Sequence, residues 1–173
     1  LNQVELNKNY ALVITTNSGL WRYLIGDTIR FTSLSPYRIK VTGRTKHHIN
    51  VFGEELMVEN TDAAIAKTCA LFDCEIVDYT VAPVFMSETQ KGSHEWIIEF
   101  KNPPEDVEKF SMILDENIQS LNSDYEAKRY NNMTLNPLVL NVARKNLFYD
   151  WLKQNDKLGG QHKIPRLSND RNY

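Results

Sequence analysis

The residues best suited to chemistry lie at three places along the chain: an aspartate, a basic segment and one late lysine. Asp27 directly follows Gly26 in "GLWRYLIGDTIRF". One carboxylate accepts two hydrogen bonds, which suits the two hydroxyl groups of a ribose diol, and a glycine permits the tight backbone step that directs it into a cleft. Gly-Asp is also typical of a plain hairpin turn, and local sequence alone favours the turn.

The second group is the basic segment "GRTKHHIN", which contains Arg44, Lys46, His47 and His48. The planar fork of Arg and the compact charge of Lys both suit phosphate. Taken alone, however, the segment is more typical of a solvated polar connector. The two histidines are adjacent, and a strand would direct them to opposite faces, so we do not expect a metal site.

The third group is Lys163 in "GGQHKIPR". A lysine on a loop is usually just exposed. Here a glycine pair precedes it and Pro165 stiffens the chain after it, an arrangement that suits a cation brought into a site at one stage of a reaction. Glu54-Glu55 is either a surface pair or the start of an acceptor site, and the sequence does not decide between them. The chain contains no Gly-rich phosphate loop, nucleophile elbow or Ser/His/Asp arrangement.

The elements that must position these residues change in type near residue 43. The first part is predicted to be a β-meander or small barrel of short antiparallel strands. The strands expected there are 10–16, 21–25, 28–33 and 38–42. Gly26-Asp27 separates the second of them from the third.

The second part is predicted to be an α+β domain of order βαββαβα, with helices covering one face of a small mixed sheet. Asn60 or Thr61 can cap its first helix, and a long helix follows Pro103-Pro104. The apolar positions of that long helix keep steps of three and four, which indicates one buried stripe: Val107, Phe110, Leu114, Ile118 and Leu121. Strands are expected at 75–82, 94–100 and 138–143, a short helix at 147–154, and a loop-like tail after it. The boundary at 43–48 is where a hinge would lie.

Composition narrows the function classes. The 173 residues carry a net charge of −2, which argues against a dedicated nucleic-acid binder. No apolar run approaches the roughly 18 residues of a membrane span. The chain opens at Leu1 rather than Met, which suggests a piece of a longer protein. Cys69 and Cys74 do not have zinc-site spacing, and we expect free thiols, as in a cytoplasmic protein.

Three motifs in order, "GLWRYLIGD", "VTGRTKHHINVFGEEL" and "GGQHKIPRL", resemble the C-terminal part of the plant auxin-responsive acyl-acid amido synthetases and their bacterial relatives. These enzymes belong to the adenylate-forming superfamily, which includes firefly luciferase and acyl-CoA synthetases. The segments "LNSDYEAKR" and "NPLVLNVARKNLFYDWL" are similar to the same family, so the resemblance covers essentially the whole chain.

This resemblance implies a role for each candidate residue. Asp27 would hold the ribose hydroxyls of ATP and AMP, and Arg44 would lie near the ribose and phosphates. Lys46 would fall at the hinge between two catalytic orientations. Lys163 would help to bring the acyl carboxylate and the α-phosphate together, with ATP and Mg²⁺ as cofactors.

The resemblance also implies a domain organisation. Residues 1–45 would be the last β-subdomain of a missing N-terminal adenylation domain, and residues 46–173 a mobile cap. The substrates would be a carboxylic acid and an amine or amino acid, and the isolated chain would be inactive. The alternative is a non-catalytic module that binds a nucleotide or a protein, and it predicts that upstream sequence lacks an ATP-binding motif.

Large aromatic residues are predicted to occupy core or domain-interface positions. They are Trp21, Tyr23, Trp96, Phe100, Phe110 and Trp151. An exposed apolar patch on the β part would agree with a missing partner domain.

Overall fold

The computed structural model describes residues 3–44, 48–132, 134–159 and 163–172. The chain divides into two compact units, unit 1 (Leu1–His48) and unit 2 (Ile49–Tyr173). Among the described residues, no helix is both long enough and apolar enough to cross a membrane. The predicted α+β class is confirmed, since both units contain sheets and unit 2 contains the helices.

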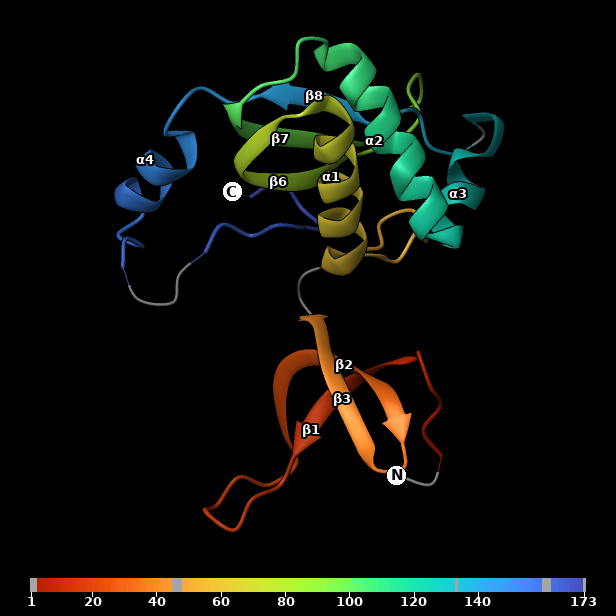
Figure 1. Cartoon of the computed structure of the whole chain (residues 1–173), viewed down its shortest axis with the longest axis vertical. Helices are drawn as coiled ribbons and strands as arrows, with labels where there is room; N and C mark the ends of the chain where they lie inside the picture. The colour runs from red at the N-terminus through yellow and green to blue at the C-terminus, as the bar shows by residue number, and fades with distance from the viewer. Residues whose placement is uncertain (1–2, 45–47, 133, 160–162, 173) are drawn as a thin grey trace. The chain divides into compact units, whose positions relative to one another are not determined.

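Unit 1 is a three-stranded antiparallel sheet in the order β1-β2-β3 (Figure 1). Its strands are β1 (Asn9–Ile14), β2 (Tyr23–Leu34) and β3 (Tyr37–Arg44). Phe31 is buried at its centre and makes edge-to-face contacts with Tyr10 and Tyr37, with ring centroids 5.9 Å apart in both pairs. β2 runs unbroken for 12 residues, where the sequence predicted two strands separated by a turn.

Trp21 and Tyr23 were predicted to occupy core or domain-interface positions, and they do not lie in the core of unit 1. Trp21 is 79% exposed and Tyr23 is 51% exposed. By contrast Trp96 and Phe110, which were predicted on the same grounds, are fully buried in unit 2. The difference is that unit 2 has two layers that bury side chains between them, whereas unit 1 is a single small sheet.

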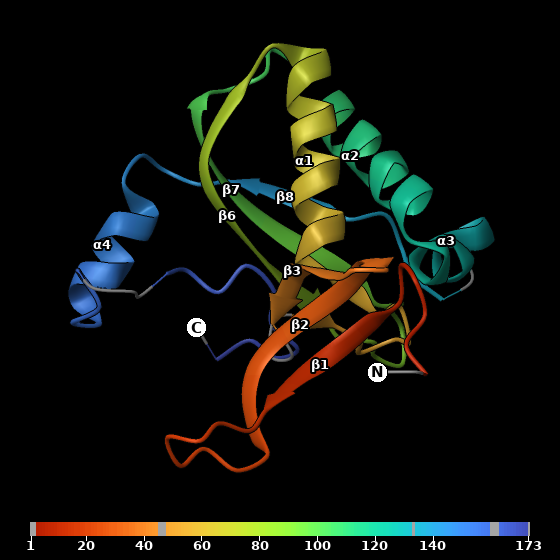
Figure 2. The same cartoon turned by 60° about the horizontal axis from the view of Figure 1, so that its bottom comes forward.

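Unit 2 is built on a three-stranded sheet in the order β6-β7-β8. β6 (Glu75–Val84) pairs antiparallel with β7 (Ser93–Asn102), and β7 pairs parallel with β8 (Val139–Val142). Helices α1 (Val58–Phe72) and α2 (Val107–Leu121) cover one face of this sheet (Figures 1 and 2). The remaining elements are β4 (His48–Ile49), β5 (Leu56–Met57), α3 (Ser123–Arg129), the 3-10 turn η1 (Tyr130–Asn132) and α4 (Leu147–Gln154).

The start of α1 differs from the expected cap at Asn60 or Thr61. The helix begins at Val58, and Asn60 lies in its first turn, where the side-chain oxygen accepts a hydrogen bond of 3.0 Å from the Met57 backbone N–H. A cap residue one turn further on was predicted because Asn and Thr also favour N-cap positions. α2 begins as expected, with the Asp106 carboxylate accepting from the Lys109 backbone N–H at 2.9 Å.

The tail of the chain is loop-like, as predicted, but part of it is anchored to the core of unit 2. Leu167 is 1% exposed and belongs to the core of unit 2. A parallel bridge joins it to Val81, with the Val81 N–H donating to the Arg166 carbonyl at 2.9 Å and the Ser168 N–H donating to the Val81 carbonyl at 3.0 Å. The tail therefore extends the sheet beyond the edge of β6.

Replacing Leu167 with Ala tests this anchoring. We expect the free energy of unfolding to fall by about 2–5 kcal/mol, because a fully buried leucine leaves a cavity. Leu158→Ala is the matched control in the same tail, since Leu158 is 43% exposed, and it should change stability by less than about 0.5 kcal/mol. Urea unfolding followed by circular dichroism measures both, and equal midpoints for the two variants would show that the tail is not part of the core.

Candidate functional site

Gly26 and Asp27 form a β-bulge inside a continuous strand. Ala11 on β1 pairs with Thr28 on β2, and Val13 pairs with Leu24. The segment of β2 between these two pairs is longer than the matching segment of β1, so β2 carries extra residues there. Gly26 has a φ of 89°, a conformation that L side chains rarely adopt. The favoured local interpretation, a hairpin turn, is therefore wrong: the pair bends a strand. Bulges redirect side chains and are frequent beside active sites.

The register of β2 with β3 places the Cα positions of Asp27 and Arg44 opposite each other. Two residues predicted from separate motifs thus become direct neighbours across the sheet. Asp27 is half-buried. The side chain of Arg44 lies outside the described part of the structure, so its placement here is that of the main chain alone.

A small polar cluster lies beside the bulge and supports it from within unit 1. The hydroxyl oxygens of Thr28 and Thr42 are both buried and lie 3.1 Å apart. The Thr42 hydroxyl also lies 3.0 Å from the side-chain oxygen of Asn9 on β1. One residue from each strand is therefore joined at the level of Asp27, which limits the freedom of the bulge.

Lys46, the expected hinge residue, lies outside the described residues, as does its neighbour His47. His48 is described and begins β4.

Lys163 is exposed and precedes a firmly held segment of unit 2. Ile164 is 7% exposed, and the Pro165 carbonyl accepts a hydrogen bond of 2.6 Å from the Thr80 hydroxyl on β6. Arg166 lies within the third motif, and the sequence pattern did not predict its contacts. Its position directly after a proline in a basic segment was the available signal.

Glu54 is neither a surface residue nor an open acceptor group. Its side chain is fully buried, and Oε1 lies 2.8 Å from Nε2 of the equally buried His94 on β7. The second carboxylate oxygen, Oε2, accepts from the Phe52 backbone N–H at 2.7 Å. Glu55 is exposed, so the adjacent pair divides into one structural carboxylate and one at the surface.

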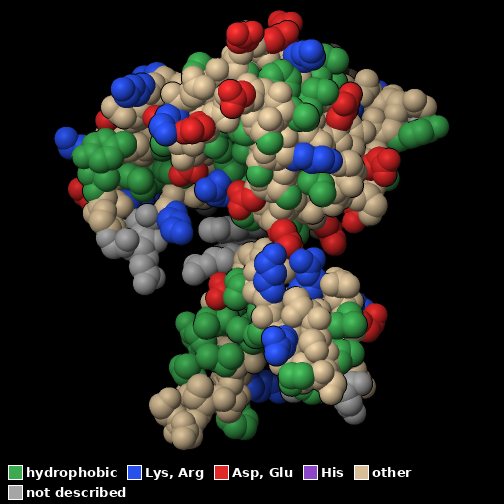
Figure 3. Space-filling model, in the orientation of Figure 1, with side chains coloured by type: hydrophobic (Ala, Val, Ile, Leu, Met, Phe, Trp, Pro, Cys, Tyr) green, Lys and Arg blue, Asp and Glu red, His purple; other side chains and the backbone are tan. Residues whose placement is uncertain are grey.

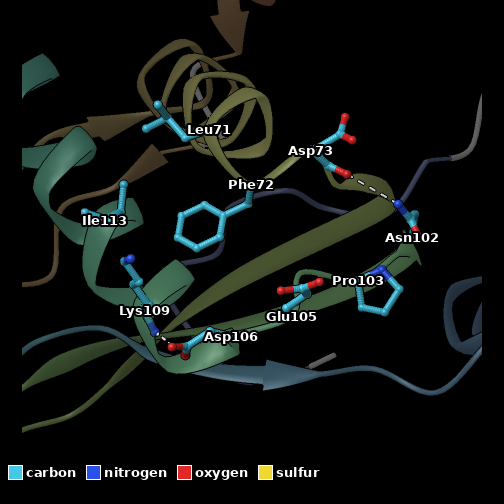
Figure 4. A pocket seen from close by; sticks show the side chains of 9 residues that line it. All are labelled: Leu71, Phe72, Asp73, Asn102, Pro103, Glu105, Asp106, Lys109 and Ile113. Atoms are coloured by element: carbon cyan, nitrogen blue, oxygen red, sulfur yellow. Dashed lines mark hydrogen bonds between the residues drawn. The ribbon is translucent and has the colours of Figure 1, made fainter.

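One cleft in the described part of unit 2 has a volume of about 810 Å³. Figure 4 shows it between the end of α1 and the start of α2, with Asp73, Glu105 and Asp106 at its rim. None of the described candidate residues lines it. Another, smaller cleft of about 230 Å³ is almost wholly apolar and lies between the sheet, α4 and the tail. It includes Ile164, the neighbour of Lys163.

The donor groups that could hold a metal ion are scattered. Across residues 3–44, 48–132, 134–159 and 163–172, no three His, Cys, Asp or Glu side chains gather in a way that could hold one. We therefore assign no Mg²⁺-binding role to the described residues.

Comparison with known proteins identifies the family. The GH3 family central domain matches residues 1–44, and the GH3 family C-terminal domain matches residues 59–172, which is more than half of the chain. The chain belongs to the GH3 family. The family predicted from the three ordered motifs is thus confirmed.

Curated GH3 relatives are amido synthetases by name. The chain is 26% identical over 181 residues to indole-3-acetic acid-amido synthetase GH3.3 of Arabidopsis thaliana. The matched region covers 96% of this chain and 30% of that protein. It is 25% identical over 181 residues to jasmonoyl-L-amino acid synthetase GH3.5 of Oryza sativa subsp. japonica, covering 99% of this chain and 30% of that protein. The chain therefore spans about 30% of the length of these relatives.

Solved structures show the same fold. The GH3.15 acyl acid amido synthetase superposes with a TM-score of 0.75 at 22% identity, covering 97% of this chain and 32% of that one. The match supports the fold of both units of this GH3 chain.

The Glu54–His94 pair generates a pH-dependent prediction. Burial raises the pKa of Glu54, but hydrogen bonds from His94 and from backbone N–H groups outweigh it and leave the pKa below its ordinary value. The ionised carboxylate therefore stabilises the folded state above the unfolded pKa of about 4.3, and this contribution is lost as the pH falls through the lower folded pKa. Glu54→Gln should cost about 1–3 kcal/mol at pH 7, and the difference from wild type should shrink below about pH 4.

Chemical unfolding at pH 7, 5 and 3 measures this difference. Glu55→Gln is the matched control, because Glu55 is the adjacent residue and is exposed. It should leave the free energy of unfolding nearly unchanged at each pH. A loss for Glu54→Gln that stays constant from pH 7 to pH 3 would contradict the assignment of an ionised Glu54.

Proposed function

We propose that this GH3 chain is the C-terminal portion of an ATP-dependent acyl-acid amido synthetase. The enzyme activates a carboxylic acid as acyl-AMP with release of pyrophosphate, and an amine, expected to be an amino acid, then attacks the acyl carbon and releases AMP. The observation that carries the proposal is the pair of family matches over residues 1–44 and 59–172. The relatives named above are acid–amino acid ligases by their printed names.

In this proposal Asp27 and Arg44 form the ribose-binding edge of the ATP site. Their opposed positions on β2 and β3 support a joint role, and the bulge at Gly26 supports a side chain redirected from the regular strand. Asp27 accepts hydrogen bonds from the two ribose hydroxyls, and Arg44 offers positive charge toward the phosphates.

Lys163 supplies the positive charge of the first half-reaction. A carboxylate is a poor acyl donor, and negative charge gathers on the α-phosphate and the leaving oxygen as the acyl-phosphate bond forms. A lysine held in place stabilises that charge electrostatically. Its exposure on the surface of unit 2 leaves it free to reach a site built largely by another domain. ATP and Mg²⁺ are the cofactors of this proposal, and the described residues of this chain offer no cluster that could hold the metal.

The proposal includes two domains and a pivot. Residues 1–45 are the last β-subdomain of an N-terminal adenylation domain, residues 46–173 are the mobile cap, and Lys46 lies at the pivot. Support comes from the division of the chain into compact units after His48. The isolated chain is expected to be inactive, because it covers about 30% of the length of its relatives.

An apolar face on unit 1 supports contact with a further domain. Figure 3 shows hydrophobic side chains gathered on one side of this unit. Large apolar residues of unit 1 that are at least half exposed are Leu6, Val13, Trp21, Tyr23, Leu24, Ile39 and Val41. Contiguous exposed apolar surface typically marks an interface, which agrees with a β-subdomain that packs against the rest of an adenylation domain.

The proposed function is tested with the full-length open reading frame that encodes this chain. Pyrophosphate release from ATP is measured over a panel of carboxylic acids, with and without amino acids. We expect release that depends on one class of acid, and an amide product only when an amine is added. The synthetase assignment fails if no acid elicits release.

With an active acid identified, Lys163→Ala separates the two half-reactions. Adenylation should slow by a factor on the order of 10²–10³, because one electrostatic contact to the developing charge is lost. Transfer from preformed acyl-AMP to the amine should be affected much less if the cap rotates and carries Lys163 away. Lys153→Ala, an exposed lysine on α4, is the matched control and should leave both rates unchanged. Equal losses in the two half-reactions would argue against rotation.

A further inference from the structure

Arg166 lies three residues after Lys163 and binds two elements of unit 2 at once. Its guanidinium carbon lies 4.5 Å from the ring centroid of Tyr79 on β6. Nη1 contacts the Asp62 carboxylate on α1 at 3.1 Å, and Nη2 lies 3.5 Å from the Asp78 carboxylate on β6. One side chain thus joins the tail to both a helix and a strand.

The groups that hold Arg166 are themselves fixed to the core. The Tyr79 ring is fully buried and stacks on Trp96 with centroids 5.4 Å apart. Its hydroxyl donates to Asp62 Oδ1 at 2.6 Å and lies 2.7 Å from the Thr61 hydroxyl. Asp62 therefore accepts from both Tyr79 and Arg166, which leaves it little freedom to turn away.

The shifts in pKa agree with a charge-assisted cluster. Burial alone would lower the pKa of Arg166, but its interactions with Tyr79, Asp62 and Asp78 raise it overall. Burial and the hydrogen bond to Asp62 raise the pKa of Tyr79, so its hydroxyl remains a donor. Arg166 stays cationic and Tyr79 stays neutral, which is the charge state that this geometry requires.

The main chain on both sides of Arg166 is fixed as well. Its carbonyl accepts from the Val81 N–H, and the Pro165 carbonyl accepts from the Thr80 hydroxyl. Only Ile164 and Pro165 separate Arg166 from Lys163. Ile164 is buried, and the proline ring fixes one of the few backbone angles that remain.

We propose that Arg166 is a positioning residue for Lys163: by clamping the tail to Asp62 and Tyr79, it fixes the point from which the lysine reaches the α-phosphate. This inference rests on the role proposed above for Lys163. The clamp needs arginine rather than lysine, because a planar guanidinium both stacks on an aromatic ring and contacts two carboxylates with separate nitrogens.

The physical test uses hydrogen exchange of the full-length protein, read by mass spectrometry over the peptide that contains residues 163–170. Arg166→Ala should accelerate exchange of the Ser168 N–H, which bonds to Val81. Arg171→Ala is the matched control: Arg171 also joins the tail to the sheet, through Glu95 and the Pro83 carbonyl, but beyond the Leu167 bridge. Unchanged exchange in Arg166→Ala would overturn the clamp.

The kinetic test separates positioning from general stability. Arg166→Ala should lower kcat for pyrophosphate release by roughly 10- to 100-fold, because a small misplacement of a catalytic group has effects of that size. KM for ATP and the transfer of preformed acyl-AMP should stay near wild type, and Arg166→Lys should recover only part of the loss. In a Lys163→Ala background, adding Arg166→Ala should change the adenylation rate no further.

Two kinetic outcomes would also overturn the proposal. Equal losses in both half-reactions, or a loss that multiplies with that of Lys163→Ala, would give Arg166 a purely structural role. If Arg166→Ala fails to fold, Asp62→Asn weakens the same ion pair with little change in volume and should give the same kinetic pattern. If Lys163→Ala itself has no effect, the proposed role of the lysine fails, whereas the exchange measurement still reports on the clamp.

Discussion

A buried tyrosine hydroxyl must find a hydrogen-bond partner, and the arrangement of unit 2 depends on how Tyr79 meets this requirement. The ring lies between the sheet and α1, stacked on Trp96, and its hydroxyl bonds to Asp62 at the first turns of the helix. That contact fixes α1 against β6 from within the core. It also turns a carboxylate toward Arg166, so the same interaction that joins helix to sheet receives the tail.

Unit 1 depends on a different constraint, the bulge at Gly26-Asp27. A strand that adds residues relative to its partner must bend, and the positive φ of Gly26 permits the bend. Because Thr28 and Thr42 are buried beside it, the bulge is part of the packing and not a loose end. The register then brings Arg44 opposite Asp27, which gives the proposed ribose-binding edge a rigid base.

Together the two constraints agree with the function proposed above, in which the site is assembled from separate domains. Each unit holds its own candidate residues by contacts inside that unit: Asp27 and Arg44 by strand pairing, and Lys163 by the anchored tail. In that proposal unit 2 is a cap that changes orientation, and it can keep its lysine in place only if the segment bearing the lysine is fixed to the cap itself. The bridge from Val81 to Leu167 provides that attachment.

The sequence by itself determined the features that depend on local pattern and on motif order. The α+β class, the family and most of the apolar stripe of α2 were predicted from it: Phe110, Leu114 and Ile118 are buried, whereas Leu121 at the end of the stripe is 39% exposed. The spacing of apolar residues indicates which face of a helix is apolar, and this prediction needs no knowledge of residues far away in the sequence.

Only the tertiary structure decided the features that depend on partners far along the chain. It showed that Gly26-Asp27 is a bulge, because a bulge is defined by the register with β1. It buried Glu54 against His94 across 40 residues, and it placed Leu167 in the core through β6. A short polar or loop-like segment has the same local sequence whether or not a distant strand edge accepts its hydrogen bonds, so these contacts leave no local pattern to read.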